Sequence, residues 1–206
     1  MEPYSASLFD MPEPQNTQEH RRKKGKGTMH LPLSYIVIDI ETTGLNPRRD
    51  AIIEIGGLAV RNGTIFDRFQ SFVRPEPFKK LTPFITNLTG IRDEDVARAP
   101  KFADILPSLC NFIGGYTIVG HNINFDIDFL YDRIYKLTGE HLNNPWIDTR
   151  KLAKTLLPGL PHYGLEFLCQ YFGIEGNHHR AVDDCELTER VLEKLYAIKE
   201  QKGRQG

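Results

Sequence analysis

Apolar and polar positions divide the first part of the chain into three predicted strands. Residues 33–40 form a nearly unbroken apolar, β-branched run, which is typical of a strand covered on both faces. Two further runs, at 51–61 and 64–74, flank Asn62-Gly63, the strongest short hairpin signal. The three strands are therefore predicted to form an antiparallel meander.

The rest of the chain alternates helical and strand patterns. The predicted elements are short helices at 83–88 and 93–97, a helix at 100–113, a strand at 116–120, a helix at 124–137, a strand at 146–147, a helix from Asp148, and helices at 163–172 and 181–199. We expect Asp148 to cap its helix rather than to bind a ligand. This order of elements predicts the α/β class, with a mixed five-stranded sheet and helices on both faces.

Composition fits one globular domain and excludes several kinds of protein. The chain has 206 residues, 40% hydrophobic content and a net charge of -1, so any binding of nucleic acid needs a local basic patch. Three scattered cysteines without CxxC spacing indicate a reducing compartment rather than a disulfide frame or a zinc site. No run of about 18 apolar residues and no signal-peptide pattern is present, so we expect a cytoplasmic protein with no membrane span.

The folded domain is expected to occupy only part of the chain. Residues 1–30 are predicted to be a disordered tail, because they carry prolines, polar residues and a basic run at 21–26 with little to bury. Residues 31–200 are predicted to form the domain, and residues 201–206 a second flexible tail.

Two acids interrupt the end of the first predicted strand. Asp39 and Glu41 are separated only by Ile40, and residues two apart on a strand point to the same face. Ionised carboxylates this close cost free energy and shift each other's pKa. One or two divalent cations would remove that cost, and oxygen ligands suit Mg²⁺ or Mn²⁺. Taken alone, the pair fits solvated acids at a strand end equally well.

Two more acids lie on apolar faces of predicted helices. Asp126 shares a face with Phe129 and Leu130, and Asp184 shares one with Val191. An acid on an apolar face needs a partner, and neither stripe offers a local basic one. Each acid alone would more often be structural, but four converging acids predict a metal site. His179, five residues before Asp184, is placed for proton transfer, because imidazole ordinarily titrates near neutrality.

Three segments in order carry a family resemblance. Residues 39–44 read Asp-Ile-Glu-Thr-Thr-Gly, residues 121–126 read His-Asn-x-x-Phe-Asp, and residues 179–184 read His-Arg-Ala-x-x-Asp. These segments resemble the three exonuclease motifs of the DEDD superfamily, histidine subgroup. The stretch 33–195 is similar to the proofreading exonucleases of bacterial DNA polymerase III, both the epsilon subunit and the domain of the Gram-positive polymerase. His178 adjoins His179, and the five-residue spacing to Asp184 selects His179.

The resemblance implies a ribonuclease H-like fold and metal-dependent 3′→5′ hydrolysis of DNA, with release of nucleoside monophosphates. It implies that Asp39 bridges two cations, Mg²⁺ or Mn²⁺, that Glu41 and Asp184 hold the ion on the nucleophile side, and that Asp126 supports the second ion. Two such ions can stabilise the attacking and leaving oxygens together. His179 would take the proton from the attacking water.

The resemblance also implies contacts with the substrate, a single-stranded or frayed 3′ end of DNA in replication proofreading or repair. Thr42, Thr43 and Leu45 would contact the terminal nucleotide, and Asn122 and Phe125 would line the cleft. Leu45 and Phe125 are apolar and would fit a core equally well.

Two other functions remain open at this point. One is an RNA-trimming exonuclease of the same superfamily, because no motif reports on the 2′-hydroxyl. The other is a catalytically silent nucleic-acid-binding module, which the intact acids and His179 disfavour. A replicative polymerase is a possible partner, and so is the sliding clamp. Leu8-Phe9 ends like a clamp-docking motif, although Ser5 stands where the usual glutamine would be.

Overall fold

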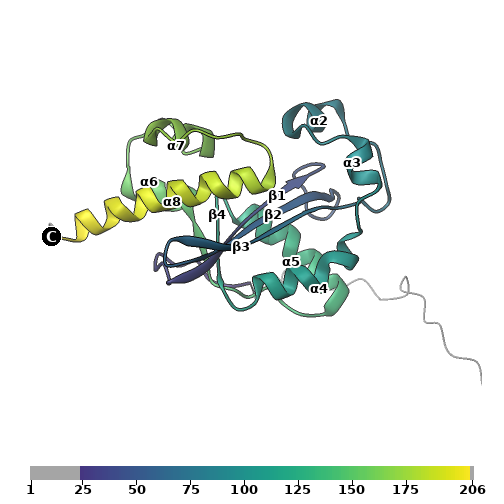
Figure 1. The fold of residues 1–206 in the computed structure, drawn as a ribbon, viewed down its shortest axis with the longest axis horizontal. Helices are drawn as coiled ribbons and strands as arrows, with labels where there is room; N and C mark the ends of the chain where they lie inside the picture. The colour runs from purple at the N-terminus through teal and green to yellow at the C-terminus, as the bar shows by residue number, and fades with distance from the viewer. Residues whose placement is uncertain (1–23, 205–206) are drawn as a thin grey trace, which may run out of the picture.

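The computed structural model describes residues 24–204, and a mixed five-stranded sheet lies at its centre (Figure 1). The strands lie side by side in the order β3-β2-β1-β4-β5. β1 and β3 both pair antiparallel with β2, whereas β4 and β5 extend the sheet in parallel with β1. The strand bounds are β1 Ser34–Thr42, β2 Ile52–Arg61, β3 Thr64–Phe72, β4 Thr117–Gly120 and β5 Trp146–Asp148. The predicted α/β class and mixed sheet are confirmed.

Helices cover both faces of this sheet, as its alternating buried residues require. Ile36 and Ile38 of β1 belong to one core cluster with α4 (Phe102–Ile113) and α5 (Asn124–Thr138). Val37, pointing the opposite way, belongs to a second cluster. The helices of that second cluster are α6 (Thr149–Leu156), α7 (Leu165–Phe172) and α8 (Ala181–Gly203). The central strand is therefore buried on both sides, as its apolar run predicts.

Two short helices complete the fold near the start of β2. α2 (Pro83–Thr89) and α3 (Asp93–Ala97) supply Ile85 and Val96 to a small cluster around Ile53. Ile52 is the partner of Thr42, so this cluster adjoins the carboxyl end of β1.

β1 continues further than its apolar run predicts. Its pairing with β2 includes Asp39 and Glu41 and reaches Thr42, with an irregularity after Glu41. Its pairing with the parallel neighbour β4 stops at Val37 and Val119. The two acids therefore lie inside β1, in the part of the strand that extends beyond β4.

The predicted domain boundaries need correction at both ends. Residues 25–28 do not belong to a separate tail, because the backbone of Trp146 accepts from Thr28 N at 2.8 Å and donates to Lys26 O at 3.1 Å. The Trp146 indole also donates to Gly25 O at 2.9 Å. A strand at the edge of a sheet leaves backbone groups unpaired, and this segment satisfies those of β5. At the other end, α8 continues through residues 201–203.

Some predictions fall on residues that the structure does not describe. The Leu8-Phe9 pair and the first three residues of the basic run, Arg21 to Lys23, lie outside the described residues. Within residues 24–204, none of the helices is both long and apolar enough to cross a membrane.

Candidate active site

Three carboxylates converge at the carboxyl end of β1. Asp39 and Glu41 project from the same face of the strand, toward the helix that begins at Ala181. Asp184 lies in the first turn of that helix, α8. One carboxylate oxygen from each of the three residues lies within 4.8 Å of the others. This convergence was predicted from the sequence, and it gives the all-oxygen donor set that hard divalent cations prefer.

The fourth predicted acid, Asp126, supports this cluster from the first turn of α5. Its side chain is only 4% exposed, and its Oδ1 accepts the backbone N–H of Ile40 at 3.0 Å. β4 has ended before this point, so Asp126 satisfies a strand N–H that the sheet leaves without a partner. Asp126 does not share the 4.8 Å grouping of the other three acids. Its hydrogen bond instead ties α5 to the strand between Asp39 and Glu41.

Burial and mutual repulsion oppose ionisation of these acids. Burial raises the pKa of Asp39 well above its ordinary value, and the negative charges of Asp126, Asp184 and Glu41 raise it further. Burial raises the pKa of Glu41 to about 8, reinforced by Asp184 and Glu54. The pKa values of Asp126 and Asp184 are also raised, chiefly by burial. Full ionisation would therefore place more negative charge here than the surroundings neutralise, and a bound cation would remove that cost.

The two histidines before α8 contact Asp184 in different ways. The backbone N–H of His179 donates to Asp184 Oδ2 at 2.9 Å, while Nδ1 of His178 lies 3.3 Å from Asp184 Oδ1. His179 is exposed and has a φ of 66°, an unusual conformation for a non-glycine residue. The described structure thus holds the His179 backbone at the acid cluster and leaves its imidazole facing solvent.

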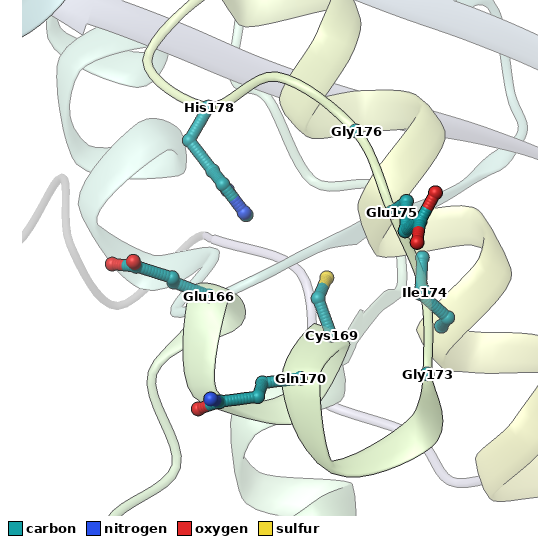
Figure 2. Close-up of a pocket in the computed structure, with 8 residues that line it drawn as sticks. All are labelled: Glu166, Cys169, Gln170, Gly173, Ile174, Glu175, Gly176 and His178. Atoms are coloured by element: carbon teal, nitrogen blue, oxygen red, sulfur yellow. The ribbon is translucent and has the colours of Figure 1, made fainter.

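The His178 ring also borders an open pocket of about 500 Å³ (Figure 2). Figure 2 shows His178 and Cys169 pointing toward one another across this pocket. Cys169 and Glu166 both lie on α7. Cys169 is buried, and burial raises its pKa to about 11, so its sulfur stays a thiol and is a poor nucleophile or metal ligand at neutral pH.

The predicted substrate contacts fall into two groups. Thr42 and Thr43 use their hydroxyls within the loop that follows β1. Thr42 donates to Gly44 O at 2.6 Å, and Thr43 Oγ1 accepts from Ala51 N at 2.9 Å. Leu45, in contrast, is 85% exposed. The structure therefore excludes the core alternative for Leu45 and leaves its side chain free to meet a ligand.

The other two predicted contacts lie between β4 and α5. Asn122 is exposed, has a φ of 62°, and donates its backbone N–H to Asp148 Oδ1 at 3.1 Å. Phe125 is half-buried and packs on the core, with its ring 4.9 Å from that of Phe129. Asp148 caps α6 by accepting from Arg150 N and Lys151 N, which confirms the predicted capping role.

His121, the first residue of the second motif, is a structural residue in this arrangement. Its Nδ1 lies 2.9 Å from Thr149 Oγ1 and its Nε2 lies 2.9 Å from Tyr163 O. Burial lowers its pKa to about 4, so the ring is neutral at physiological pH. It joins the end of β4 to the segment before α7.

Glu54, which was not among the predicted site residues, lies beside the cluster on β2. Glu54 is the strand partner of Glu41, is fully buried, and binds the Arg180 guanidinium through both carboxylate oxygens at 3.1 and 2.9 Å. A single acid inside the apolar run of residues 52–55 was the available signal. An acid there needs a partner, just as Asp126 and Asp184 do.

Comparison with known proteins identifies relatives of this arrangement. Residues 36–192 match a sequence model of the family described as RNase_T, Exonuclease. The PolC-type DNA polymerase III of Oceanobacillus iheyensis is 40% identical over 163 residues, which is 79% of this chain and 11% of the polymerase. The corresponding Bacillus subtilis polymerase is 38% identical over 172 residues, 82% of this chain and 12% of that protein. The chain thus spans a small part of the length of these relatives.

Solved structures share the fold. Exonuclease X in complex with 5′ overhanging duplex DNA has a TM-score of 0.63 and 28% identity, covering 79% of this chain and 91% of that one. E. coli Exonuclease I in complex with a dT13 oligonucleotide has a TM-score of 0.71 at 18% identity, covering 84% of this chain and 43% of that one. The second likeness concerns the fold alone. Together they confirm the expected ribonuclease H-like fold.

Proposed function

Because this chain belongs to the RNase_T exonuclease family, we propose that it hydrolyses DNA from the 3′ end with two divalent cations and releases nucleoside monophosphates. The observation that carries this proposal is the convergence of Asp39, Glu41 and Asp184 within 4.8 Å. A binding module has no need of several acids that repel one another in a buried or half-buried cluster, whereas a metal-dependent nuclease does.

The residues present fit the cations that this activity needs. The donors are carboxylate oxygens, and their raised pKa values reflect negative charge that a cation would neutralise. Asp39, Glu41 and Asp184 would hold one ion, and Asp39 with Asp126 would support the second. Bound there, Mg²⁺ or Mn²⁺ would supply positive charge to the attacking and leaving oxygens of the phosphodiester.

The chain's own groups would orient the substrate and move the proton. Asp126 keeps β1 fixed through its bond to Ile40 N, so the two strand acids hold their spacing. The exposed His179 imidazole would accept the proton of the attacking water, and the exposed Leu45 would contact the terminal nucleotide. Thr42, Thr43, Asn122 and Phe125 would shape the surrounding cleft.

DNA is the favoured substrate because the curated relatives are DNA polymerases and the Exonuclease X structure contains DNA. Those names support a role in replication proofreading or repair, alongside a replicative polymerase. The substrate would be a single-stranded or frayed 3′ end, because an unpaired end reaches the acids without the cost of melting a duplex.

One assay tests polarity, substrate and cation together. The full chain, with Mg²⁺ or Mn²⁺, is given end-labelled single-stranded DNA, duplex DNA, RNA and a closed circular single strand. We expect mononucleotides from the 3′ end of linear DNA and no cleavage of the circle. Asp39→Asn should lose nearly all activity. Activity within about tenfold of the wild type, roughly 1.4 kcal/mol in barrier, would contradict the metal assignment. Faster turnover of RNA would assign the enzyme to RNA trimming instead.

A further inference from the structure

Glu54 lies outside the group of converging acids and makes its own set of hydrogen bonds. Its side chain is 0% exposed and accepts four hydrogen bonds. Two come from Arg180, at 3.1 and 2.9 Å, one from the backbone N–H of Ala181 at 3.2 Å, and one from Gln70 at 3.1 Å. A bidentate guanidinium–carboxylate pair fixes orientation as well as distance. Three of the four bonds therefore hold the short segment 180–181 against β2.

That segment lies between two functional residues. His179 precedes it, and Asp184 follows in the first turn of α8. The N–H of His179 bonds back to Asp184 Oδ2, and the φ of 66° at His179 turns the chain sharply just before Arg180. A residue in this conformation persists only when its surroundings hold it there. On the β2 side, Glu54 supplies such restraint through its three hydrogen bonds to Arg180 and Ala181.

Gly56 adds a second point of attachment on the same face of β2. A Cβ atom at Gly56 would lie 2.3 Å from the Ala181 carbonyl carbon and 2.5 Å from Val182 N. Only glycine lets the start of α8 approach the strand this closely. Residues 180–182 thus pack against Glu54 and Gly56 of β2. This contact lies directly beside Glu41, the strand partner of Glu54.

We propose that Glu54 is a positioning residue, which holds residues 179–181 so that His179 and Asp184 keep their places relative to Asp39 and Glu41. This role rests on the proposed nuclease function. Glu54 touches neither substrate nor reacting atoms, and it acts through Arg180 and the Ala181 backbone. A displacement of about 1 Å in a catalytic group can cost on the order of 100-fold in rate, so loss of this restraint would reach the chemistry.

The test compares three variants of the full chain. Glu54→Gln keeps the shape of the side chain and removes its charge. Arg180→Lys keeps the positive charge and removes the bidentate contact with Glu54. Gln70→Ala is the matched control, because it removes the one hydrogen bond to Glu54 that comes from β3 rather than from residues 180–181. The readouts are kcat and KM on a short single-stranded oligonucleotide, thermal stability, and amide hydrogen exchange of residues 177–184.

We expect Glu54→Gln and Arg180→Lys to lower kcat by about 10- to 100-fold with KM within about threefold, and to speed exchange within residues 177–184. Gln70→Ala should leave all three readouts near wild type. Normal kcat in both variants, or a kcat loss in Gln70→Ala as large as theirs, would overturn the positioning role. Unchanged exchange would overturn it too. A wild-type chain inactive on every substrate would refute the proposed function, and the exchange data would still decide whether Glu54 restrains the segment.

Discussion

At the scale of single residues, the acid cluster is a local excess of negative charge that the fold tolerates. Burial raises the pKa values of Asp39, Glu41, Asp126 and Asp184, and neighbouring acids add to the shift at Asp39 and Glu41. Protons and divalent cations therefore compete for the same carboxylates. Cation binding should displace protons, and the affinity for Mg²⁺ should rise as the pH rises through about 8, the pKa of Glu41.

The two histidines before α8 can be distinguished by mutation. His179→Ala should lower the rate of hydrolysis by about 10²–10⁴-fold, the usual contribution of a general base. His178→Ala should cost less than about tenfold, because Asp184 keeps its bond from the His179 backbone when the His178 ring is lost. Initial rates at saturating substrate measure both effects. Free imidazole added to His179→Ala should restore part of the rate and leave His178→Ala unchanged. Equal losses in the two variants would refute the assignment of His179.

The residues of the site differ in how well the sequence predicts them. The four acids were predictable because each interrupts an apolar strand or an apolar helix face, where an unpartnered charge is costly. The partner of Glu54 was not predictable, because Arg180 lies 126 positions along the chain. The unusual backbone of His179 also depends on tertiary contacts with Asp184 and β2. The local pattern of apolar residues predicts which side chains are buried. It does not predict which side chains pair across long distances in the sequence.

At the scale of elements, a second buried acid joins α8 to the other end of β1. Tyr35 donates its hydroxyl to Glu189 Oε1 at 2.6 Å, and among the described residues Glu189 Oε2 has no hydrogen-bond partner. The pKa of Glu189 is raised to about 7, chiefly by burial and also by nearby Glu193, while the hydrogen bond from Tyr35 opposes the shift. The packing of α8 on β1 should therefore depend on pH.

The sign of this dependence follows from the raised pKa. Glu189 ordinarily titrates at 4.5, so the folded state holds its proton more tightly than the unfolded state does. Protonated Glu189 thus stabilises the folded state relative to its ionised form. This contribution to the free energy of unfolding is fully present below about pH 4.5 and is lost as the pH rises through about 7. Glu189→Gln should therefore gain about 1–3 kcal/mol over the wild type between pH 4.5 and 8. Urea unfolding at several pH values measures the difference. Glu200→Gln, an exposed acid on the same helix, is the control. A difference between Glu189→Gln and the wild type that does not change with pH would refute the role of Glu189.

Elements were predicted more accurately than their ends. Each predicted strand and helix is present, because periodic burial of apolar residues determines both kinds of element. β1 runs two residues beyond its predicted end because β2 continues to pair with it. The alignment of residues 25–28 with Trp146 had no sequence signal, since Gly25, Lys26 and Thr28 contribute backbone groups rather than apolar side chains. Backbone pairing at a sheet edge is thus the part of this fold that is hardest to predict from the sequence pattern.

At the scale of the whole molecule, charge is distributed unevenly although the total is only -1. The acids gather at one end of β1, while five cationic residues lie between positions 21 and 26. Lys24 pairs with Asp128 on α5. Arg21, Arg22 and Lys23 precede Lys24 in the sequence and lie outside the described residues. They are candidates for contact with the phosphates of long substrates.

Two truncations separate this role from that of the neighbouring segment. Removing residues 1–23 should leave thermal stability and the turnover of a short oligonucleotide unchanged, because no predicted catalytic residue lies there. Binding to long single-stranded DNA should weaken, and its salt dependence should become shallower by up to about 2 units, or about 0.7 for each of three phosphate contacts. Removing residues 1–30 should also lower thermal stability, because the backbone bonds to Trp146 are lost with it. Equal salt slopes for the full chain and the shorter truncation would exclude phosphate contacts by Arg21, Arg22 and Lys23.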